Sequence, residues 1–295
     1  MPTESLDQLP GIEIGSLTID ADVTLRTLTA RASAPQGTAL LLHGFAETVL
    51  GWKQIASDLA KDYDVHAFEW PGYGRSTRPP VERFSYAPVA YAELLKAYID
   101  KVGIDRSSLV IYATDISALP ALLLALAEPD IAKSIIVTDF APFNRPELMW
   151  DKLQGLKTPG MAEHVRAAMN AGRDEILANT FNRGLPVDAH YEVDAAFKAD
   201  MRHCWDQGEM TVVDAFAHYY TSFTRDQEHF EANLDRITTP VKVLWGADDM
   251  FIRKEMGVEL ADRLQAEITL LPGVGHYAHH QAPQAAIDEI RAAFR

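Results

Sequence analysis

The sequence predicts an α/β fold, in which a mostly parallel central sheet is flanked by helices. Three observations lead to this prediction. Short, wholly apolar runs alternate with segments of helical periodicity, as buried parallel strands and their right-handed crossover helices do. Residues 12–32 alternate between apolar and polar positions, which is typical of half-buried antiparallel strands. The apolar runs stop near residue 144 and resume after residue 236, with a polar helical stretch between them.

The elements are predicted in the following order. An edge hairpin is predicted over residues 12–32. Most of the strands after it are followed by a predicted helix. Buried strands are predicted at 39–42, 65–68, 109–112, 134–137, 241–245 and 267–271. Helices are predicted at 52–59, 86–102, 254–264 and 285–294, with another that is rich in Ala and Leu and runs through Leu126.

Two domains are predicted. The core comprises residues 1–143 and 237–295, and residues 144–236 form an inserted helical cap with scattered aromatic residues. An insertion between two halves of one sheet lies over the carboxyl ends of the strands, where open α/β sheets bind ligands. We therefore expect a binding site between the core and the cap.

Composition and charge restrict the class of ligand. The chain has 295 residues, 47% of them hydrophobic, and 27 Lys and Arg against 42 Asp and Glu give a net charge of −15. This charge repels nucleic acids and anionic membranes. We therefore expect a small, neutral or weakly polar organic substrate, and no nucleic acid or membrane as a partner. The oligomeric state is open, with a homodimer among the expected assemblies.

The compartment is expected to be the cytoplasm. The single cysteine, Cys204, cannot form an intramolecular disulfide, and the first residues lack the basic and then apolar pattern of a secretory signal. No apolar run is long enough to span a bilayer.

The segment A-T-D-I-S at residues 113–117 follows a predicted buried strand. A nucleophile elbow needs small residues two positions before and after the nucleophile, and this rule is met with Asp115 at the centre. Centring the elbow on Ser117 would place Leu119 at a small position, which it does not fit. Asp115 is therefore the candidate nucleophile, and the competing hypothesis is that it only caps the following helix.

His276 follows the last predicted strand after two glycines and is the candidate base, ahead of the nearby His279 and His280. A histidine base needs an acid that fixes its tautomer. Asp249 is expected to be this acid, with Asp139 and Asp248 as the next candidates, although acids at strand ends are often only turn residues.

Two backbone N–H groups are expected to stabilise negative charge on an oxygen in the site. One belongs to Phe45, which follows His43-Gly44, and the other to Ile116, which follows the candidate nucleophile. The chain order of nucleophile, acid and histidine is that of α/β-hydrolases.

These motifs together resemble the α/β-hydrolase superfamily over nearly the whole chain outside the cap. The matching pieces are H-G-F at 43–45, W-P-G-Y-G-R-S at 70–76, the Asp115 elbow, W-G at 245–246 with Asp249, and G-H at 275–276. An aspartate at the elbow resembles the branch that contains epoxide hydrolases, haloalkane dehalogenases and fluoroacetate dehalogenases. The resemblance implies that Asp115 attacks a saturated carbon and forms an alkyl ester, which His276 then hydrolyses through a water molecule.

The resemblance also implies residues for the leaving group. The segment F-A-H-Y-Y-T at 216–221 resembles the cap helix of epoxide hydrolases and places Tyr220 at the position of the tyrosine that protonates the epoxide oxygen. Thr221 stands where those enzymes commonly carry arginine, and Ala46 replaces their usual proline. Tyr191 is the candidate second cap tyrosine, and Trp150 and Tyr219 are expected to contact the substrate.

The dehalogenases match less well. Haloalkane dehalogenases carry tryptophan after the nucleophile and asparagine after His-Gly, where this chain has Ile116 and Phe45. Fluoroacetate dehalogenases carry arginines at the positions of Ile116 and Leu119. Trp150 and Trp205 remain candidate donors to a halide.

Opening of an epoxide to a diol is the first expectation, ahead of organohalide dehalogenation. Two further functions stay open at the level of the sequence: a different α/β-hydrolase reaction with Asp115 as a base or anchor, and a non-catalytic ligand receptor. No metal or organic cofactor is expected, because the sequence has no phosphate-binding loop and the pair His279-His280 is too compact for a metal site.

Overall fold

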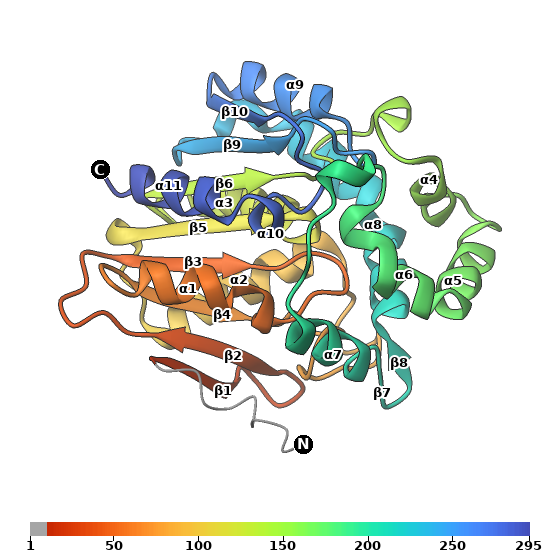
Figure 1. Ribbon diagram of the computed structural model, residues 1–295, viewed down its shortest axis with the longest axis horizontal. Coiled ribbons are helices and arrows are strands. Elements are labelled where there is room, and N and C mark those ends of the chain that lie inside the picture. The colour runs from red at the N-terminus through yellow and green to blue at the C-terminus, as the bar shows by residue number, and fades with distance from the viewer. Residues whose placement is uncertain (1–10) are drawn as a thin grey trace.

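The computed structural model describes residues 11–295 and contains an eight-stranded sheet (Figure 1). The strand order is β1-β2-β4-β3-β5-β6-β9-β10. Strands β1 and β2 form an antiparallel edge hairpin, β2 is antiparallel to β4, and all pairings from β4 to β10 are parallel. The predicted α/β class, edge hairpin and mostly parallel sheet are confirmed. The strands are β1 (Ile12–Thr18), β2 (Thr24–Ala30), β3 (Thr38–Leu42), β4 (Asp64–Phe68), β5 (Leu109–Thr114), β6 (Ser134–Thr138), β9 (Val241–Gly246) and β10 (Glu267–Leu271).

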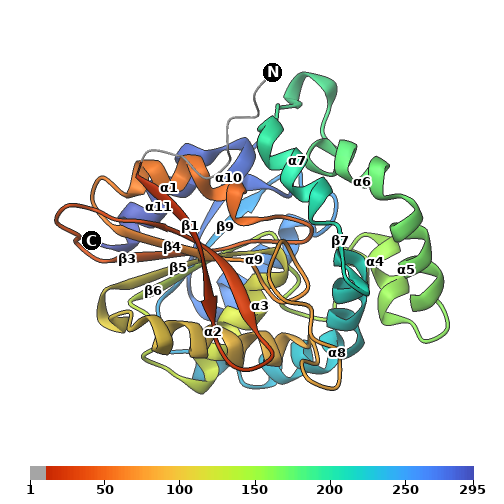
Figure 2. The ribbon, with the colours of Figure 1, turned by 90° about the horizontal axis from the view of Figure 1, so that it is seen from below.

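Helices cover both faces of the sheet (Figure 2). Helices α1 (Lys53–Leu59) and α11 (Pro283–Ala293) pack on one face, and α2 (Pro88–Val102), α3 (Ala118–Ala127) and α9 (Lys254–Leu264) pack on the other. In β3, Leu40 and Leu42 belong to one core cluster and Ala39 and Leu41 to the other, because successive strand residues face opposite sides. This burial on both faces explains why the strand sequences are continuously apolar.

The segment between β6 and β9 is helical, as expected for the insert (residues 144–236). Figures 1 and 2 show these helices at one end of the sheet, the end toward which the arrowheads of β3 and β6 point. Two short strands, β7 (Asp206–Gln207) and β8 (Met210–Thr211), precede its longest helix. The helices are α4 (Asp151–Lys157), α5 (Ala162–Ala171), α6 (Arg173–Asn179), α7 (Ala195–His203) and α8 (Val212–Ala232).

Buried polar contacts join the insert to the core. Arg26 of β2 donates to Asp200 of α7 at 2.7 Å and to Glu69 at 3.1 Å, and all three side chains are nearly inaccessible to solvent. Arg78 donates to the backbone carbonyls of three insert residues: Cys204, Trp205 and Met210. Breaking such buried pairs is costly, because it leaves an uncompensated charge. The α7 to β8 portion of the insert is therefore firmly attached to the core.

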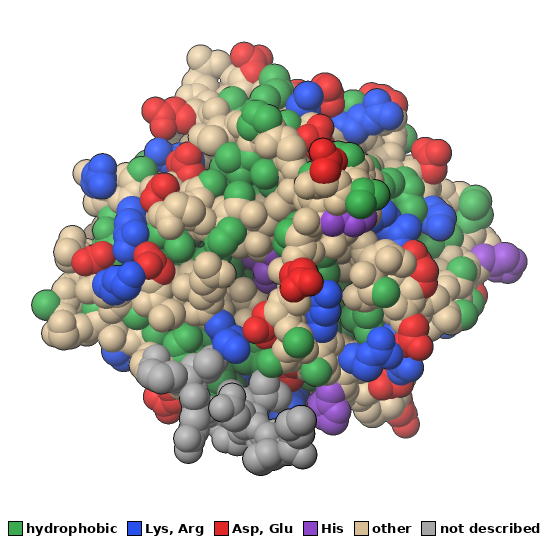
Figure 3. Space-filling view, in the orientation of Figure 1, with side chains coloured by type: hydrophobic (Ala, Val, Ile, Leu, Met, Phe, Trp, Pro, Cys, Tyr) green, Lys and Arg blue, Asp and Glu red, His purple; other side chains and the backbone are tan. Residues whose placement is uncertain are grey.

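On the face shown in Figure 3, acidic and basic side chains are interspersed rather than gathered by sign. Elsewhere on the surface, Arg145 pairs with both Glu231 and Glu259 at 2.7 Å. Within residues 11–295, no helix combines the length and the apolar character that crossing a bilayer requires.

One buried histidine of the sheet makes stability depend on pH. His66 of β4 is 3% exposed, and its Nδ1 lies 3.2 Å from the Tyr98 hydroxyl. Burial, and then the nearby Arg31, lower the pKa of His66 to about 4. The unfolded chain therefore binds this proton more readily than the native state, so stability is retained above pH 6.5 and lost as the pH falls toward 4.

We predict that His66→Gln flattens this dependence. Between pH 7.5 and 4.5, the wild-type free energy of unfolding should fall by roughly 2–3 kcal/mol more than that of the variant. Urea denaturation at both pH values measures this difference. Equal losses in the two proteins would show that His66 carries no pH dependence.

Candidate active site

Asp115 lies in a tight turn between β5 and α3. Its φ of 51° is in the left-handed region, which is unfavourable for most residues other than glycine but is entered more readily by aspartate and asparagine. Gly44 passes close to this turn, and a Cβ added there would lie 2.9 Å from the Asp115 Cβ. Ser117 is fully buried, and its hydroxyl donates to the carbonyl of Thr114 at 2.7 Å. The elbow therefore presents the aspartate rather than the serine.

Three side chains are aligned at the carboxyl ends of the strands. The Phe45 N–H donates to Asp115 Oδ2 at 2.7 Å, and His276 Nε2 lies 3.8 Å from Asp115 Oδ1, which is too long for a hydrogen bond. His276 Nδ1 lies 2.8 Å from Asp249 Oδ2. The other oxygen of Asp249 accepts from the N–H groups of Phe251 and Ile252. The arrangement is a carboxylate facing an imidazole that a second carboxylate orients.

The three candidate acids have different surroundings. Asp248 is exposed and accepts from the N–H of Gly273 at 2.8 Å. Asp139 is fully buried, accepts from the N–H of Gly246 at 2.9 Å, and contacts the Thr138 hydroxyl. Burial and then the charge of Asp249 raise the pKa of Asp139 well above its usual value. Asp249 is thus the acid that bonds to His276, and burial beside Asp249 favours the protonated form of Asp139.

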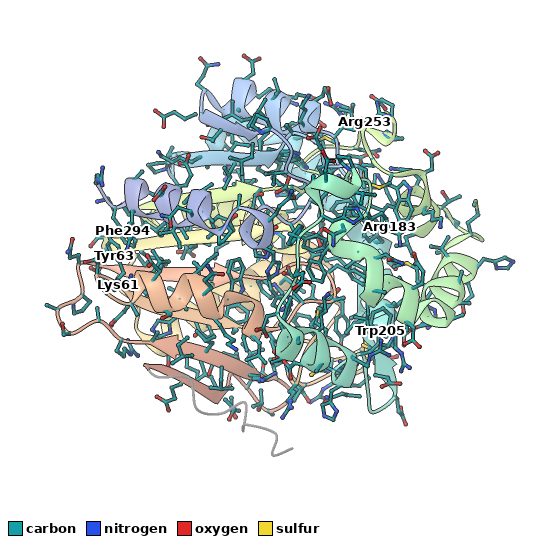
Figure 4. The ribbon with its side chains drawn as sticks, viewed as in Figure 1. Lys61, Tyr63, Arg183, Trp205, Arg253 and Phe294 are labelled. Atoms are coloured by element: carbon teal, nitrogen blue, oxygen red, sulfur yellow. The ribbon has the colours of Figure 1, made fainter. Side chains whose placement is uncertain are left out.

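Asp115, His276 and Phe45 line a cavity of about 380 Å³. Most of its other lining side chains are apolar and come from both the core and the insert: Trp150, Leu153, Val165, Ala168, Met169, Ile176, Phe216, Phe251, Ile252 and Tyr277. Arg183, which Figure 4 labels on the insert side, and Lys152 also line it, and their charges lie 5.7 and 5.0 Å from the ring of Trp150. This combination of an apolar wall and a few polar groups is typical of sites for small organic molecules.

Asp115 also borders a second cavity of about 10 Å³, close to the volume that one water molecule needs. Ile116, Tyr219 and Tyr220 line it as well. Burial and then the charge of Asp115 raise the pKa of Tyr220 well above 10, and burial does the same for Tyr219 with help from Tyr220 and Asp115. Both hydroxyls therefore hold their protons at neutral pH beside the carboxylate.

A family model for the α/β hydrolase fold matches residues 39–283. The chain belongs to the α/β-hydrolase fold family. This α/β-fold hydrolase is 22% identical over 282 residues to the 2-hydroxy-6-oxononadienedioate/2-hydroxy-6-oxononatrienedioate hydrolase of Cupriavidus pinatubonensis, covering 90% of this chain and 89% of that relative. It is 31% identical to epoxide hydrolase 4 of Homo sapiens over 101 residues, which are 34% of this chain and 27% of that relative.

Solved structures share the fold of this hydrolase. The epoxide hydrolase CorEH superimposes with a TM-score of 0.76 at 17% identity, covering 96% of this chain and 98% of that one. Because relatives named for different substrates match the chain, membership of the aspartate-nucleophile branch has to be argued from the site itself.

The remaining expected site residues are only partly brought together. Trp150 lines the larger cavity and Tyr219 the smaller one, but Tyr191 and Trp205 are not among the residues that line either cavity. The Trp205 ring packs edge-on against Phe45 with centroids 6.4 Å apart, so it supports the loop that carries the donor N–H.

Sequence reasoning missed Glu47, which is 2% exposed and contacts the Nε2 atoms of His279 and His280 at 2.9 and 2.6 Å. The available signal was a charged residue inside the apolar loop after His43. These three side chains offer potential metal ligands, a set that the histidine pair alone did not suggest. Their spacing is that of hydrogen bonds, and a tetrahedral zinc ion would need its ligand atoms roughly 3.4 Å apart.

The surroundings of His276 control its proton. Burial alone would lower the pKa of His276, but the charges of Asp249 and Asp115 outweigh this effect, and the pKa lies well above its usual value. In the free hydrolase the two carboxylates therefore favour the protonated form of the imidazole.

We predict that Asp249→Asn lowers the pKa of His276 by roughly one to three pH units, because it removes the charge that stabilises the imidazolium. Asp139→Asn should change that pKa much less, since Asp249 and not Asp139 accepts the hydrogen bond of the imidazole. NMR titration of the imidazole signals measures both values. A larger change in Asp139→Asn would identify Asp139 as the orienting acid instead.

Proposed function

We propose that this hydrolase attacks a saturated carbon through Asp115 and opens an epoxide to a diol. The alignment of Asp115, His276 and Asp249 beside the Phe45 N–H carries the proposal. A carboxylate that attacks an ester or amide gives an anhydride, which reverts readily. Attack on a saturated carbon gives a stable alkyl ester, so a carboxylate nucleophile suits that reaction.

The first step forms the ester. Asp115 Oδ1, the oxygen that the Phe45 N–H does not hold, bonds to an epoxide carbon as the carbon–oxygen bond of the ring breaks. The oxygen that leaves takes a proton from the Tyr220 hydroxyl. Both Tyr219 and Tyr220 border the smaller cavity beside Asp115, and Tyr220 is favoured because it is 6% rather than 1% exposed.

The second step hydrolyses the ester. Water adds to the Asp115 carbonyl carbon while His276 takes one of its protons, and the negative charge that develops on Oδ2 is stabilised by the Phe45 N–H and, in this scheme, that of Ile116. The tetrahedral intermediate then expels the diol oxygen, which is protonated by His276. The proton left on the Asp115 carboxyl returns through solvent to the Tyr220 oxygen, so that Asp115, His276 and Tyr220 all end as they began. The gap of 3.8 Å between His276 and Asp115 leaves His276 free to bond to water rather than to the nucleophile.

Ester formation also switches the role of His276. The charge of Asp115 helps to raise the pKa of His276 in the free enzyme. Alkylation removes this charge, so the pKa of His276 falls and a larger share of the imidazole is available as a base when there is an ester to hydrolyse.

The leaving group distinguishes the two candidate reactions. An epoxide oxygen needs a proton, which the hydroxyls beside Asp115 can supply. A halide needs N–H donors, and Trp150 is the only indole in the lining of the larger cavity, within the described part of the chain. Dehalogenation is therefore the second candidate.

We predict that His276→Ala accumulates the ester, because the water that hydrolyses it is no longer activated. The variant is incubated with styrene oxide, 1,2-epoxyoctane or 1-bromooctane and followed by intact-protein mass spectrometry. An added mass equal to the whole epoxide, mapped to Asp115, supports the proposal, and an alkyl adduct from 1-bromooctane alone supports dehalogenation.

Asp115→Asn is the control and should bind substrate without any adduct. If binding is lost together with activity in this control, Asp115 is an anchor. Ligand binding by the wild type without turnover or adduct would instead indicate a receptor.

We predict that Tyr220→Phe slows ester formation from epoxides by about 10²- to 10⁴-fold, because the leaving oxygen loses its general acid. The reaction with 1-bromooctane should not change, since bromide needs no proton. Tyr219→Phe is the matched control on the same helix. Equal losses in both variants, measured by rapid quench, would rule out Tyr220 as the specific acid.

A further inference from the structure

The buried carboxylate of Glu47 joins the two segments that carry the candidate catalytic groups. Its Oε2 accepts from the N–H of Gly44 at 2.7 Å, and the next residue is Phe45, which donates to Asp115. Its Oε1 contacts His279 and His280, which lie in α10 (Ala278–Gln281) directly after His276. One side chain thus bonds to the donor loop and to the histidine segment together.

Hydrogen bonds from the Gly44 N–H and from histidines hold the Glu47 carboxylate at this position. Burial would raise the pKa of Glu47, but the contacts with His279 and His280 outweigh burial and hold it well below its usual value. Burial lowers the pKa of His279 to about 4, so this imidazole is neutral and donates through Nε2. A buried, ionised carboxylate is stable only when such donors satisfy it.

Aromatic rings fix both histidines in place. Trp52 stacks on His279 with ring centroids 4.5 Å apart, and Phe197 of α7 stacks on His280 at 5.0 Å. The two histidine side chains therefore have little freedom to move. Because Glu47 bonds both to them and to the Gly44 N–H, it restrains the backbone at Gly44 as well.

The donor loop needs this support. Ala46 has a φ of 61°, a left-handed conformation that is strained for alanine. A Cβ on Gly44 would lie 2.9 Å from both Glu47 Oε2 and Asp115 Cβ, so the loop is held closely between the two carboxylates. Without the bond from Gly44 to Glu47, the strain at Ala46 can relax and turn the Phe45 N–H away from Asp115.

We infer that Glu47 is a positioning residue that keeps the Phe45 N–H and His276 correctly placed relative to Asp115 and thereby sets the rate of ester hydrolysis. This inference rests on the proposed function. The N–H of Phe45 stabilises charge that develops on Oδ2 during hydrolysis, whereas ester formation withdraws charge from the carboxylate. Loss of Glu47 therefore slows the second step selectively.

The test compares Glu47→Ala and Glu47→Gln with the wild type on an epoxide that it turns over. In Glu47→Ala, kcat should fall on the order of 10- to 100-fold, as for a misaligned oxyanion donor. The ratio kcat/KM, which reports ester formation, should change less than about threefold, and rapid-quench mass spectrometry should show the ester as the main steady-state species.

Glu47→Gln should recover kcat to within about tenfold of the wild type. The amide oxygen can accept from Gly44 while the amide nitrogen donates to histidines in the other tautomer. In this tautomer the proton lies on His279 Nδ1, a buried atom with no hydrogen-bond partner among residues 11–295, so the recovery is expected to be partial. His280→Phe, which keeps a ring against Phe197, is a milder variant that should shift kcat in the same direction if Glu47→Ala does not fold.

Leu59→Ala is the control for a general loss of stability, because Leu59 is fully buried in α1 away from the two cavities. It should lower the melting temperature without accumulating ester.

Parallel falls of kcat and kcat/KM in Glu47→Ala and His280→Phe, or the absence of ester in both, would overturn the inference. If His276→Ala accumulates ester and these variants do not, the inference fails while the proposed function stands. If His276→Ala forms no ester, the proposed function fails first.

Discussion

The sharp backbone turn at Asp115 determines where the other residues of the site must lie. β5 is buried on both faces between β3 and β6, so the chain can reach α3 only by turning sharply at the sheet edge. A left-handed residue costs about 1–3 kcal/mol, which the pairing of three parallel strands offsets. Because the turn is rigid and the side chain is short, the Asp115 carboxylate has little freedom. The neighbouring loops therefore have to lie close to Asp115. Gly44 lies so close that a Cβ on it would be 2.9 Å from the Asp115 Cβ.

A second pair of acids shows how the environment divides chemical roles. Asp139 and Asp249 lie at the ends of neighbouring strands, and both contact groups near His276. Asp139 is fully buried beside another carboxylate, which raises its pKa, and it accepts from the N–H at the end of β9 and so links this strand to β6. Asp249 accepts two backbone N–H groups and carries the charge that orients the imidazole. Two chemically identical side chains thus have different contacts: one joins two strands, and the other orients the imidazole.

Most of the fold could be predicted from periodic patterns. Burial on one face makes apolar and polar residues alternate along a strand, and burial on both faces makes the strand continuously apolar. The tight turn at residues 113–117 could be predicted as well, because such a turn requires small residues two positions before and after its centre. The choice between Asp248 and Asp249 was not readable, because the conformation of the loop after β9 turns one outward to Gly273 and the other inward to His276. Glu47 meets its histidines across more than 230 residues, and no periodicity reports such a contact. Trp205 looked like a substrate donor because aromatic residues give the same signal whether they line a cavity or support a loop.

The uneven attachment of the insert has a consequence for how this hydrolase can diversify. Asp200 and the backbone of residues 204–210 are tied to core arginines, whereas α5 has no fully buried side chain and yet contributes Val165, Ala168 and Met169 to the larger cavity. Substitutions on α5 therefore alter the shape of the cavity at little cost in folding free energy. This helix is where natural variation or a mutant library can change substrate preference while the reacting groups, fixed at the sheet edge, stay as they are.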